Sequence, residues 1–287
     1  MRILNFGSIN IDTTFFVDEF SRAGVTVSAN GQKQSFGGKG FNQSVALARA
    51  GAGVYHAGKV GKDGISLREY LSACGANVEF IGISDEPTGC AMIQVDKNGE
   101  NCIVVYGGAN RDISKEYADG VLGHFGAGDM IVLQNEISNV GYIAKRAKKA
   151  GMTVVLNPSP IGGLDVDISD VDMLVLNENE ADALFDSHDA EAIEAMVNKI
   201  YPNVRVVLTL GEHGSEYIGG GERFHVDAVK VNAVDTTGAG DTFTGYFLAG
   251  VVGGLSVRNA MERASCAAAI AVTRRGAAEA VPLKEEL

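Results

Sequence analysis

The chain has 287 residues, 46% of them hydrophobic, and a formal net charge of −12 at pH 7. Such a length is enough for one large α/β core, and no apolar run reaches the ~18 residues that predict a membrane-spanning helix. The acidic balance excludes surfaces built to neutralise nucleic acid or to lie on anionic lipid, so we expect neither partner.

The four cysteines (Cys74, Cys90, Cys102 and Cys266) stand in apolar surroundings. They have neither the paired spacing of metal ligands nor the density of a disulfide scaffold. We therefore expect free thiols and a cytoplasmic protein.

The first expected strand ends in Ser8-Ile9-Asn10-Ile11-Asp12. Alternation along a strand places Asn10 and Asp12 on the same side. Paired acceptors at the carboxyl end of a strand suit two vicinal hydroxyls of a sugar. An isolated Asp at such a position is otherwise usually a turn or cap residue.

A glycine-rich segment, Gly-Gly-Lys-Gly-Phe-Asn-Gln, occupies residues 37–43 and opens a helix expected over residues 44–50. A flexible backbone, one cation and two amides at a helix start could bind hydroxyls, with Lys39 complementing negative charge. Taken alone, such a segment is more often an ordinary loop with a solvated lysine.

Two stretches, residues 13–35 and 88–106, change to alternating polar and apolar strands. In the second, residues 91–95 and 102–106 flank the turn Asp96-Lys97-Asn98-Gly99, which predicts a hairpin. We expect a small β-sheet lid inserted into the main body, placed to cap a pocket at the carboxyl ends of the main strands.

The middle of the chain alternates buried strands with helical patterns. The strands are expected to be continuous apolar runs at residues 130–133, 153–156, 173–176 and 206–209, and the helices at residues 140–150, 178–185 and 190–200. Runs without alternation are typical of parallel strands covered on both faces. The pattern predicts a single α/β domain over residues 1–287, with a doubly wound, mostly parallel sheet flanked by helices.

The segment Asp-Thr-Thr-Gly-Ala-Gly-Asp, residues 235–241, precedes an apolar helix expected over residues 244–252. Small residues at a helix start let backbone N–H groups approach an anion, which indicates a phosphate site. Asp241 could then accept the proton of an attacking hydroxyl, or it could merely cap the helix. The segment is neither a P-loop nor a dinucleotide fingerprint.

Together these segments resemble the ribokinase (PfkB-type) family of carbohydrate kinases. Residues 37–43 are similar to the family's N-terminal signature, and residues 235–241 to its C-terminal signature. Further matches lie at residues 107–110, 133–136, 157–158, 177–180 and 209–211, so the resemblance spans nearly the whole chain.

The resemblance implies a role for each matching residue. Asp241 would be the catalytic base, and the turn Gly238-Ala239-Gly240 would be the anion hole for the transferring phosphoryl group. The sugar would be bound by Asn10, Asp12, Gly38, Lys39, Asn42 and Glu136, beside Asp241.

The resemblance also implies ATP, Mg²⁺ and K⁺. The nucleotide and its phosphates would lie against Asn177, Glu180, Thr209, Gly211, Gly214, Gly240 and Ser265. Mg²⁺ would be held largely through phosphates and water. A K⁺ site would be formed by Asp235, Thr237, Ala271, Arg274 and Gly276.

The implied activity is ATP-dependent phosphorylation of the 5-hydroxyl of D-ribose or a similar small sugar. A fructokinase-like or adenosine kinase-like enzyme and a catalytically silent sugar-binding regulator remain alternatives. A homodimer through the lid is also implied. Four positions depart from the family pattern: Ala23 and Val25 in the lid, Ser265 in place of a His near the adenine, and Ala280 in place of a Ser at the K⁺ site.

Overall fold

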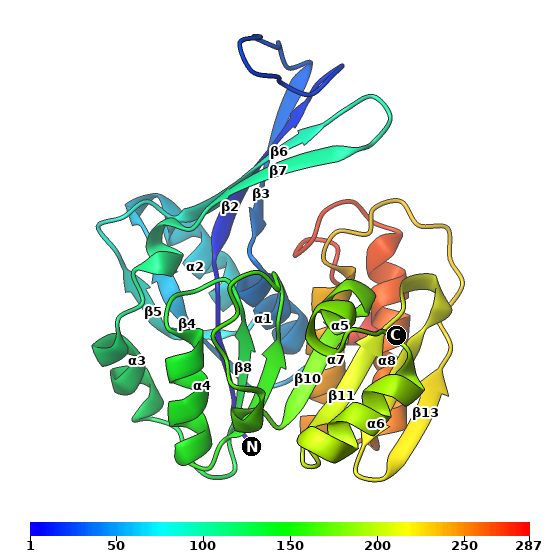
Figure 1. Cartoon of the computed structure of the whole chain (residues 1–287). Helices are drawn as coiled ribbons and strands as arrows, with labels where there is room; N and C mark the ends of the chain where they lie inside the picture. Colours follow the sequence, from blue (N-terminus) through cyan, green and yellow to red (C-terminus); the bar gives the residue numbers. More distant parts are fainter.

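The computed structural model describes residues 1–287 and shows an α/β body from which a smaller sheet projects (Figure 1). The body contains a nine-stranded sheet in the order β13-β12-β11-β10-β9-β8-β1-β4-β5. Its strands are β1 (Ile3–Phe6), β4 (Val54–Val60), β5 (Asn77–Ile83), β8 (Met130–Gln134), β9 (Thr153–Asn157), β10 (Met173–Asn177), β11 (Arg205–Thr209), β12 (Ser215–Gly219) and β13 (Glu222–Val226).

The seven strands from β5 to β11 are parallel, and β12 and β13 add an antiparallel edge. Strand β1 lies between β4 and β8, so the chain builds the sheet outward from β1 in both directions. The order therefore reverses beside β1, and crevices at the carboxyl ends of strands around such a switch point are the usual ligand sites of open α/β sheets.

Helices cover both faces of this sheet. They are α1 (Lys39–Arg49), α2 (Ile65–Ala73), α3 (Lys115–Leu122), α4 (Val140–Lys149), α5 (Glu178–Phe185), α6 (Ala190–Ile200), α7 (Ala239–Val252) and α8 (Val257–Val272). Short 3-10 helices are η1 (Lys62–Gly64), η2 (Gly108–Arg111), η3 (Ile168–Asp170), η4 (Gly211–His213) and η5 (Lys284–Glu286). None of the helices combines the length and apolar character needed to cross a membrane.

Two hydrophobic clusters fill the space between helices and sheet. On one face, α1, α2, α7 and α8 pack against residues such as Val132 and Val175. On the other, α3 to α6 pack against the alternate residues of the same strands, such as Leu133 and Leu174. Because both faces are buried, the strands read as continuous apolar runs. The predicted doubly wound sheet is confirmed.

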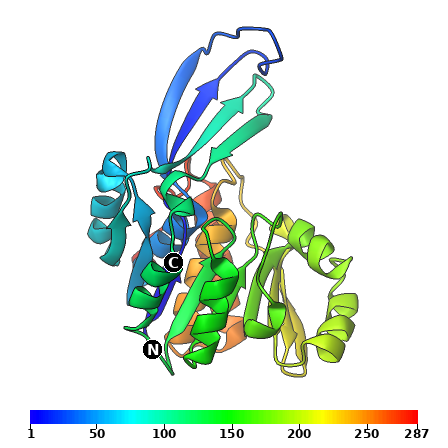
Figure 2. The same ribbon diagram turned by 60° about the vertical axis from the view of Figure 1, so that its left-hand side comes forward.

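The smaller sheet, which we call the lid, has four strands in the order β3-β2-β6-β7 and stands over one edge of the body (Figure 2). Its strands are β2 (Asn10–Phe16), β3 (Gly31–Gly37), β6 (Gly89–Val95) and β7 (Asn101–Tyr106). The central pair β2 and β6 is parallel, and the outer pairs are antiparallel. The expected hairpin at residues 91–106 is present as β6 and β7.

Two boundaries differ from the sequence expectation. Asn10 and Asp12 do not end the first strand, because β1 stops at Phe6 and both residues belong to the lid strand β2. The two motif helices also begin five residues earlier than expected, α1 at Lys39 and α7 at Ala239. Both glycine-rich signatures are thus partly wound into helix, which fixes the side chains that they carry.

Candidate active site

The glycine-rich turn before α7 sets the position of Asp241. Gly238 is the N-cap residue and lies in the left-handed region, at φ 73° and ψ 8°. A Cβ on Gly238 would also lie 2.9 Å from the Cβ of Ala277, so glycine meets both a conformational and a steric need. Helix α7 then begins at Ala239, and Asp241 lies in its first turn.

The Asp241 carboxylate does not cap α7. Asp241 is only 8% exposed, and its carboxylate accepts hydrogen bonds from two amides of α1. Asn42 Nδ2 donates to Oδ2 at 3.0 Å, and Gln43 Nε2 donates to Oδ1 at 2.9 Å. The N-cap of α7 has no side-chain hydrogen bond. The geometry therefore argues against the capping interpretation and leaves a carboxylate fixed between two helix starts.

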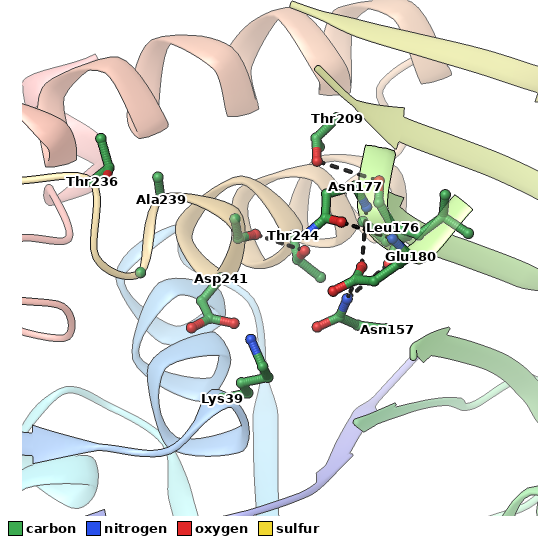
Figure 3. A pocket seen from close by; sticks show the side chains of 13 residues that line it. Lys39, Asn157, Leu176, Asn177, Glu180, Thr209, Thr236, Ala239, Asp241 and Thr244 are labelled. Carbon is green, nitrogen blue, oxygen red and sulfur yellow. Dashed lines mark hydrogen bonds between the residues drawn. The ribbon is translucent and has the colours of Figure 1, made fainter. Parts of the chain in front are cut away.

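Lys39 begins α1 and points toward Asp241 (Figure 3). Burial by itself would lower the pKa of Lys39. The carboxylates of Asp241 and Glu136, with a smaller contribution from Glu180, outweigh burial and raise that pKa. The Lys39 ammonium is therefore charged and faces the site.

Glu136 follows β8 and ties the start of α1 to the end of β1. Its Oε2 accepts a hydrogen bond from the backbone N–H of Lys39 at 3.0 Å and another from the hydroxyl of Ser8. Asp12 faces the same carboxylate from the lid. Sequence positions that are far apart, 12, 39, 136 and 241, are thus brought to one place.

Asp12 is a buried acid with an unpaired oxygen. Burial raises its pKa to about 6, and the neighbouring Glu136 carboxylate adds to the effect. Its Oδ1 atom is shielded from solvent and has no hydrogen-bond partner. A buried acceptor without a donor is costly, and hydroxyl groups of a bound ligand would satisfy it.

Asn10 is oriented by a residue to which the sequence assigned no role. Asn110, in η2, donates from Nδ2 to Asn10 Oδ1 at 2.8 Å and accepts from the backbone N–H of Ile9 at 3.0 Å. Gly38 packs its Cα against the backbone of Ser8 and Asn10. The sugar-site residues expected from the sequence thus form one cluster, with Asn110 behind it.

A small cavity of about 180 Å³ is lined by Asp241 and Lys39 (Figure 3). Its polar lining consists of Lys39, Asn157, Asn177, Glu180, Thr209, Thr236, Asp241 and Thr244. The backbone of Gly238, Ala239 and Gly240 closes one wall, where the N-terminus of α7 offers free N–H groups to an anion. Asn157, Thr236 and Thr244 were not among the expected site residues.

Asn177 and Glu180 form a capping box at the start of α5. Asn177 Oδ1 accepts from the backbone N–H of Glu180, and Glu180 Oε2 accepts from that of Asn177, each at 3.0 Å. Asn157 Nδ2 reaches the same Glu180 oxygen at 3.4 Å. These reciprocal bonds hold both side chains at the cavity wall.

A larger cavity of about 990 Å³ adjoins the first and shares Asn177, Thr209 and Gly240 with it. Gly211, Gly214 and Ser265, which were expected to frame a nucleotide, line it together with Phe243, Ala269 and Val272. The smaller, polar cavity suits the phosphates of a nucleotide, and the larger, partly apolar cavity beside it suits the base. Every nucleotide residue expected from the sequence lies on one of the two cavities.

The Asp235 turn is tied to the segment that follows α8. Asp235 Oδ1 accepts from the backbone N–H of Thr237 at 3.0 Å, and Oδ2 from that of Gly276 at 2.9 Å. Burial alone would raise the pKa of Asp235, but these bonds lower it. Arg274 instead pairs with Glu286 at 2.5 Å, and the carbonyl of Ala271 accepts from the backbone N–H of Arg274 at 3.0 Å. An ionised carboxylate and backbone carbonyls therefore lie beside the glycine-rich turn that precedes α7.

Comparison with known proteins agrees with this geometry. A family model described as pfkB family carbohydrate kinase matches residues 2–284. The chain is 35% identical over 290 residues to a ribokinase of Haemophilus influenzae, covering 98% of this chain and 95% of that protein. It is 33% identical over 299 residues to a deoxyribokinase of Salmonella typhi, covering 100% and 97%.

Among solved structures, the ribokinase of Arabidopsis thaliana complexed with ribose and ATP matches with a TM-score of 0.86 at 31% identity. The match covers 99% of this chain and 96% of that one. Body and lid are therefore both part of a known architecture.

Proposed function

Because the chain belongs to the pfkB family of carbohydrate kinases, and is thus a phosphotransferase with an alcohol group as acceptor, we propose that it transfers the γ-phosphate of ATP to the 5-hydroxyl of D-ribose. The observation that carries this proposal is the position of Asp241. Its side chain lines the small cavity at the start of α7, and its carboxylate accepts a hydrogen bond from Asn42, one of the expected sugar-site residues. 2-Deoxy-D-ribose is the second candidate, because one relative of similar identity is a deoxyribokinase.

In the proposed mechanism, Asp241 accepts the proton of the sugar hydroxyl as that oxygen attacks the γ-phosphorus of ATP, and the bond from that phosphorus to ADP breaks. Phosphoryl transfer needs little other covalent catalysis, so the remaining groups position the reactants and neutralise negative charge. The N–H groups at the start of α7 and the Lys39 ammonium stabilise the negative charge on the transferring group. Both are already in place around the cavity.

The acceptor sugar would lie against Asn10, Asp12 and Glu136. The unpaired Oδ1 of Asp12 would accept from a ring hydroxyl, and Asn10, held by Asn110, would present its amide beside it. Neighbouring Gly38 and Asn42 would close the pocket. Short polar side chains suit a small polyol and leave no apolar shelf for a nucleobase on this side.

ATP would occupy the two adjoining cavities, with its phosphates in the smaller one and its base near Ser265 in the larger. No three His, Cys, Asp or Glu side chains cluster as a metal cage. Mg²⁺ would therefore be carried by the phosphates and water beside Asn177 and Glu180, and would supply charge neutralisation there. K⁺ would bind the Asp235 carboxylate and the carbonyls near Ala271 and Gly276, beside the anion hole.

The lid would close over the sugar and exclude water, which favours transfer to the sugar over hydrolysis.

The edge strand β7 of the lid exposes Ile103, Val104, Val105 and Tyr106, each at least 50% exposed. We propose that two copies of the chain form a homodimer by pairing this strand. Sedimentation of Val105→Asp beside the unchanged protein would test this proposal.

The four free cysteines favour a cytoplasmic location.

The experiment that tests the assignment of Asp241 is Asp241→Asn. If Asp241 is the base, turnover falls by about 10²- to 10⁴-fold while sugar and nucleotide still bind by calorimetry. Asp189→Asn is the matched control, since Asp189 caps the remote helix α6 and Asn caps about equally well. Retention of more than about a tenth of the activity in Asp241→Asn would contradict the mechanism.

Acceptor identity is tested by a panel of D-ribose, 2-deoxy-D-ribose, D-fructose and adenosine with ATP. We expect D-ribose to give the highest kcat/KM. A higher value for another acceptor would reassign the substrate within the family. Absence of ADP release with every acceptor would instead favour a silent sugar-binding regulator.

A further inference from the structure

The side chain of Gln43 lies fully buried against the Asp241 carboxylate and lines neither of the two cavities. Its Nε2 donates to Asp241 Oδ1 at 2.9 Å and also reaches Asn157 Oδ1 at 3.2 Å. Its Oε1 accepts from Gln134 Nε2 at 2.7 Å. Every polar atom of this amide is thus engaged, and its partners come from β8, β9 and α7.

The direction of these bonds is fixed by a backbone carbonyl. The carbonyl of Gly40 can only accept, so Asn5 must direct Nδ2 toward it, at 2.7 Å. Asn5 Oδ1 then accepts from Gln134 Nε2 at 2.9 Å. Because that nitrogen also donates to Gln43 Oε1, Gln43 can only present its Nε2 to Asp241. The three amides therefore form a relay with one orientation.

The far end of the relay agrees with this direction. Asn5 Nδ2 also donates to the hydroxyl oxygen of Ser44 at 2.8 Å, and that hydroxyl lies 2.7 Å from His56 Nδ1. Burial lowers the pKa of His56 to about 3, so the ring is neutral and can accept from Ser44. Asn5, Gln43, Ser44 and His56 are all fully buried.

We propose that Gln43 is a positioning residue, which holds the Asp241 carboxylate in the orientation for proton transfer and is itself aligned by Gln134 and Asn5. A charge-assisted hydrogen bond from a buried, pre-aligned amide restricts a carboxylate more than solvent does. With Asn42 on the other oxygen, Asp241 keeps a fixed plane and still has free lone pairs for the incoming proton. The proposal rests on the proposed function, in which Asp241 is the base.

The test is Gln43→Met, which keeps the length of the side chain and removes its donor. A lost hydrogen bond to a charged group predicts a fall in kcat of about 10- to 100-fold. KM for sugar and for ATP should stay within about threefold, because Gln43 acts on the base and not on ligand binding. Tyr117→Phe is the control, since it removes partly buried hydrogen bonds to the carbonyls of Gly58 and Phe80 and touches no residue of the site. Its kcat should be unchanged.

A double-mutant cycle separates positioning from general damage. In an Asp241→Asn background the base is already absent, so adding Gln43→Met should not lower the residual turnover further. If Gln43 only supported the fold, adding Gln43→Met would lower the residual turnover by about the same factor as it lowers the turnover of the unchanged protein. Gln134→Met provides a second perturbation that does not touch Asp241, and a several-fold fall in kcat that vanishes in the Asp241→Asn background is expected.

Two results would overturn the proposal: full turnover in Gln43→Met, or a loss that multiplies with that of Asp241→Asn. Should Gln43→Met fail to fold, judged by circular dichroism and thermal unfolding, the Gln134→Met cycle decides alone. The two hypotheses fail differently. An active Asp241→Asn variant refutes the assigned base, whereas an inactive one with an active Gln43→Met variant refutes only the positioning role.

Discussion

Replacing Asp12 with Asn should stabilise the sugar-free protein, by an amount that grows with pH. Burial, with a contribution from Glu136, raises the pKa of Asp12 from 3.8 to about 6. The folded state therefore holds this proton more tightly than the unfolded chain does. The stability linked to Asp12 is fully present below pH 3.8 and is lost as the pH rises to about 6, where the folded carboxylate also ionises.

The magnitude follows from the shift. About two pKa units at ~1.36 kcal/mol each make the ionised Asp12 cost roughly 3 kcal/mol of folding free energy at pH 7. At pH 5 the folded side chain is still protonated, and the cost is only about 1.5 kcal/mol. Asp12→Asn removes the charge and keeps the shape. Its advantage in unfolding free energy should therefore be larger at pH 7 than at pH 5 by about 1.5 kcal/mol.

Urea denaturation of both proteins at the two pH values measures this difference directly. Asp63→Asn serves as the control, because burial alone would raise the pKa of Asp63 but hydrogen bonds from Thr88 hold it below its ordinary value. Its effect on stability should be equal at pH 5 and pH 7, since both lie above that range. The reasoning would be refuted if the difference in unfolding free energy between Asp12→Asn and the unchanged protein did not change with pH. It would also be refuted if the variant were less stable than the unchanged protein at pH 7.

Three further predictions concern the site. The KM for sugar should rise as the pH falls below about 6, because protonated Asp12 accepts fewer hydrogen bonds, and Asp12→Asn should flatten that profile. Gly238→Ala should lose about 1–2 kcal/mol of stability and most of its turnover, since its φ is 73° and its Cβ would press on Ala277. Gly254→Ala, with φ 87° and open space around its Cβ, should lose stability alone. Turnover in K⁺ should exceed that in tetramethylammonium, and Asp235→Ala should abolish the difference; equal rates in the two cations would dispose of the K⁺ site.

The body of the fold could be predicted because its strands are buried on both faces. Continuous apolar runs at residues 130–133 and 173–176 have no solvent face to impose alternation, and helix α4 between them ends just before Gly151. The early starts of α1 and α7 could not be predicted in the same way. Glycine-rich segments have low helix propensity, and their winding here depends on the packing of the two helices against each other.

In the candidate site, too, some residues could be predicted from the sequence and others could not. Asp241 and the glycine turn could be proposed from the sequence alone, because small residues before a helix are a local pattern that indicates a phosphate site. The bond between Gln43 and Asp241 joins residues 198 positions apart, and Asn110 meets Asn10 across 100 positions. Such pairs depend on where tertiary packing brings the side chains, and nothing in the local sequence of Gln43 or Asn110 indicates a partner.

The lid strand β2 carries Asn10 and Asp12, so the lid is not a module that can be exchanged freely. Its neighbours are fitted to these two side chains: a Cβ on Gly37 would overlap the Asp12 carboxylate, and one on Gly89 would overlap the side chains of Asn10 and Asn110. A chimera that receives this lid therefore also receives half of the proposed sugar pocket. Engineers who transplant it should expect acceptor preference and lid architecture to be inherited together.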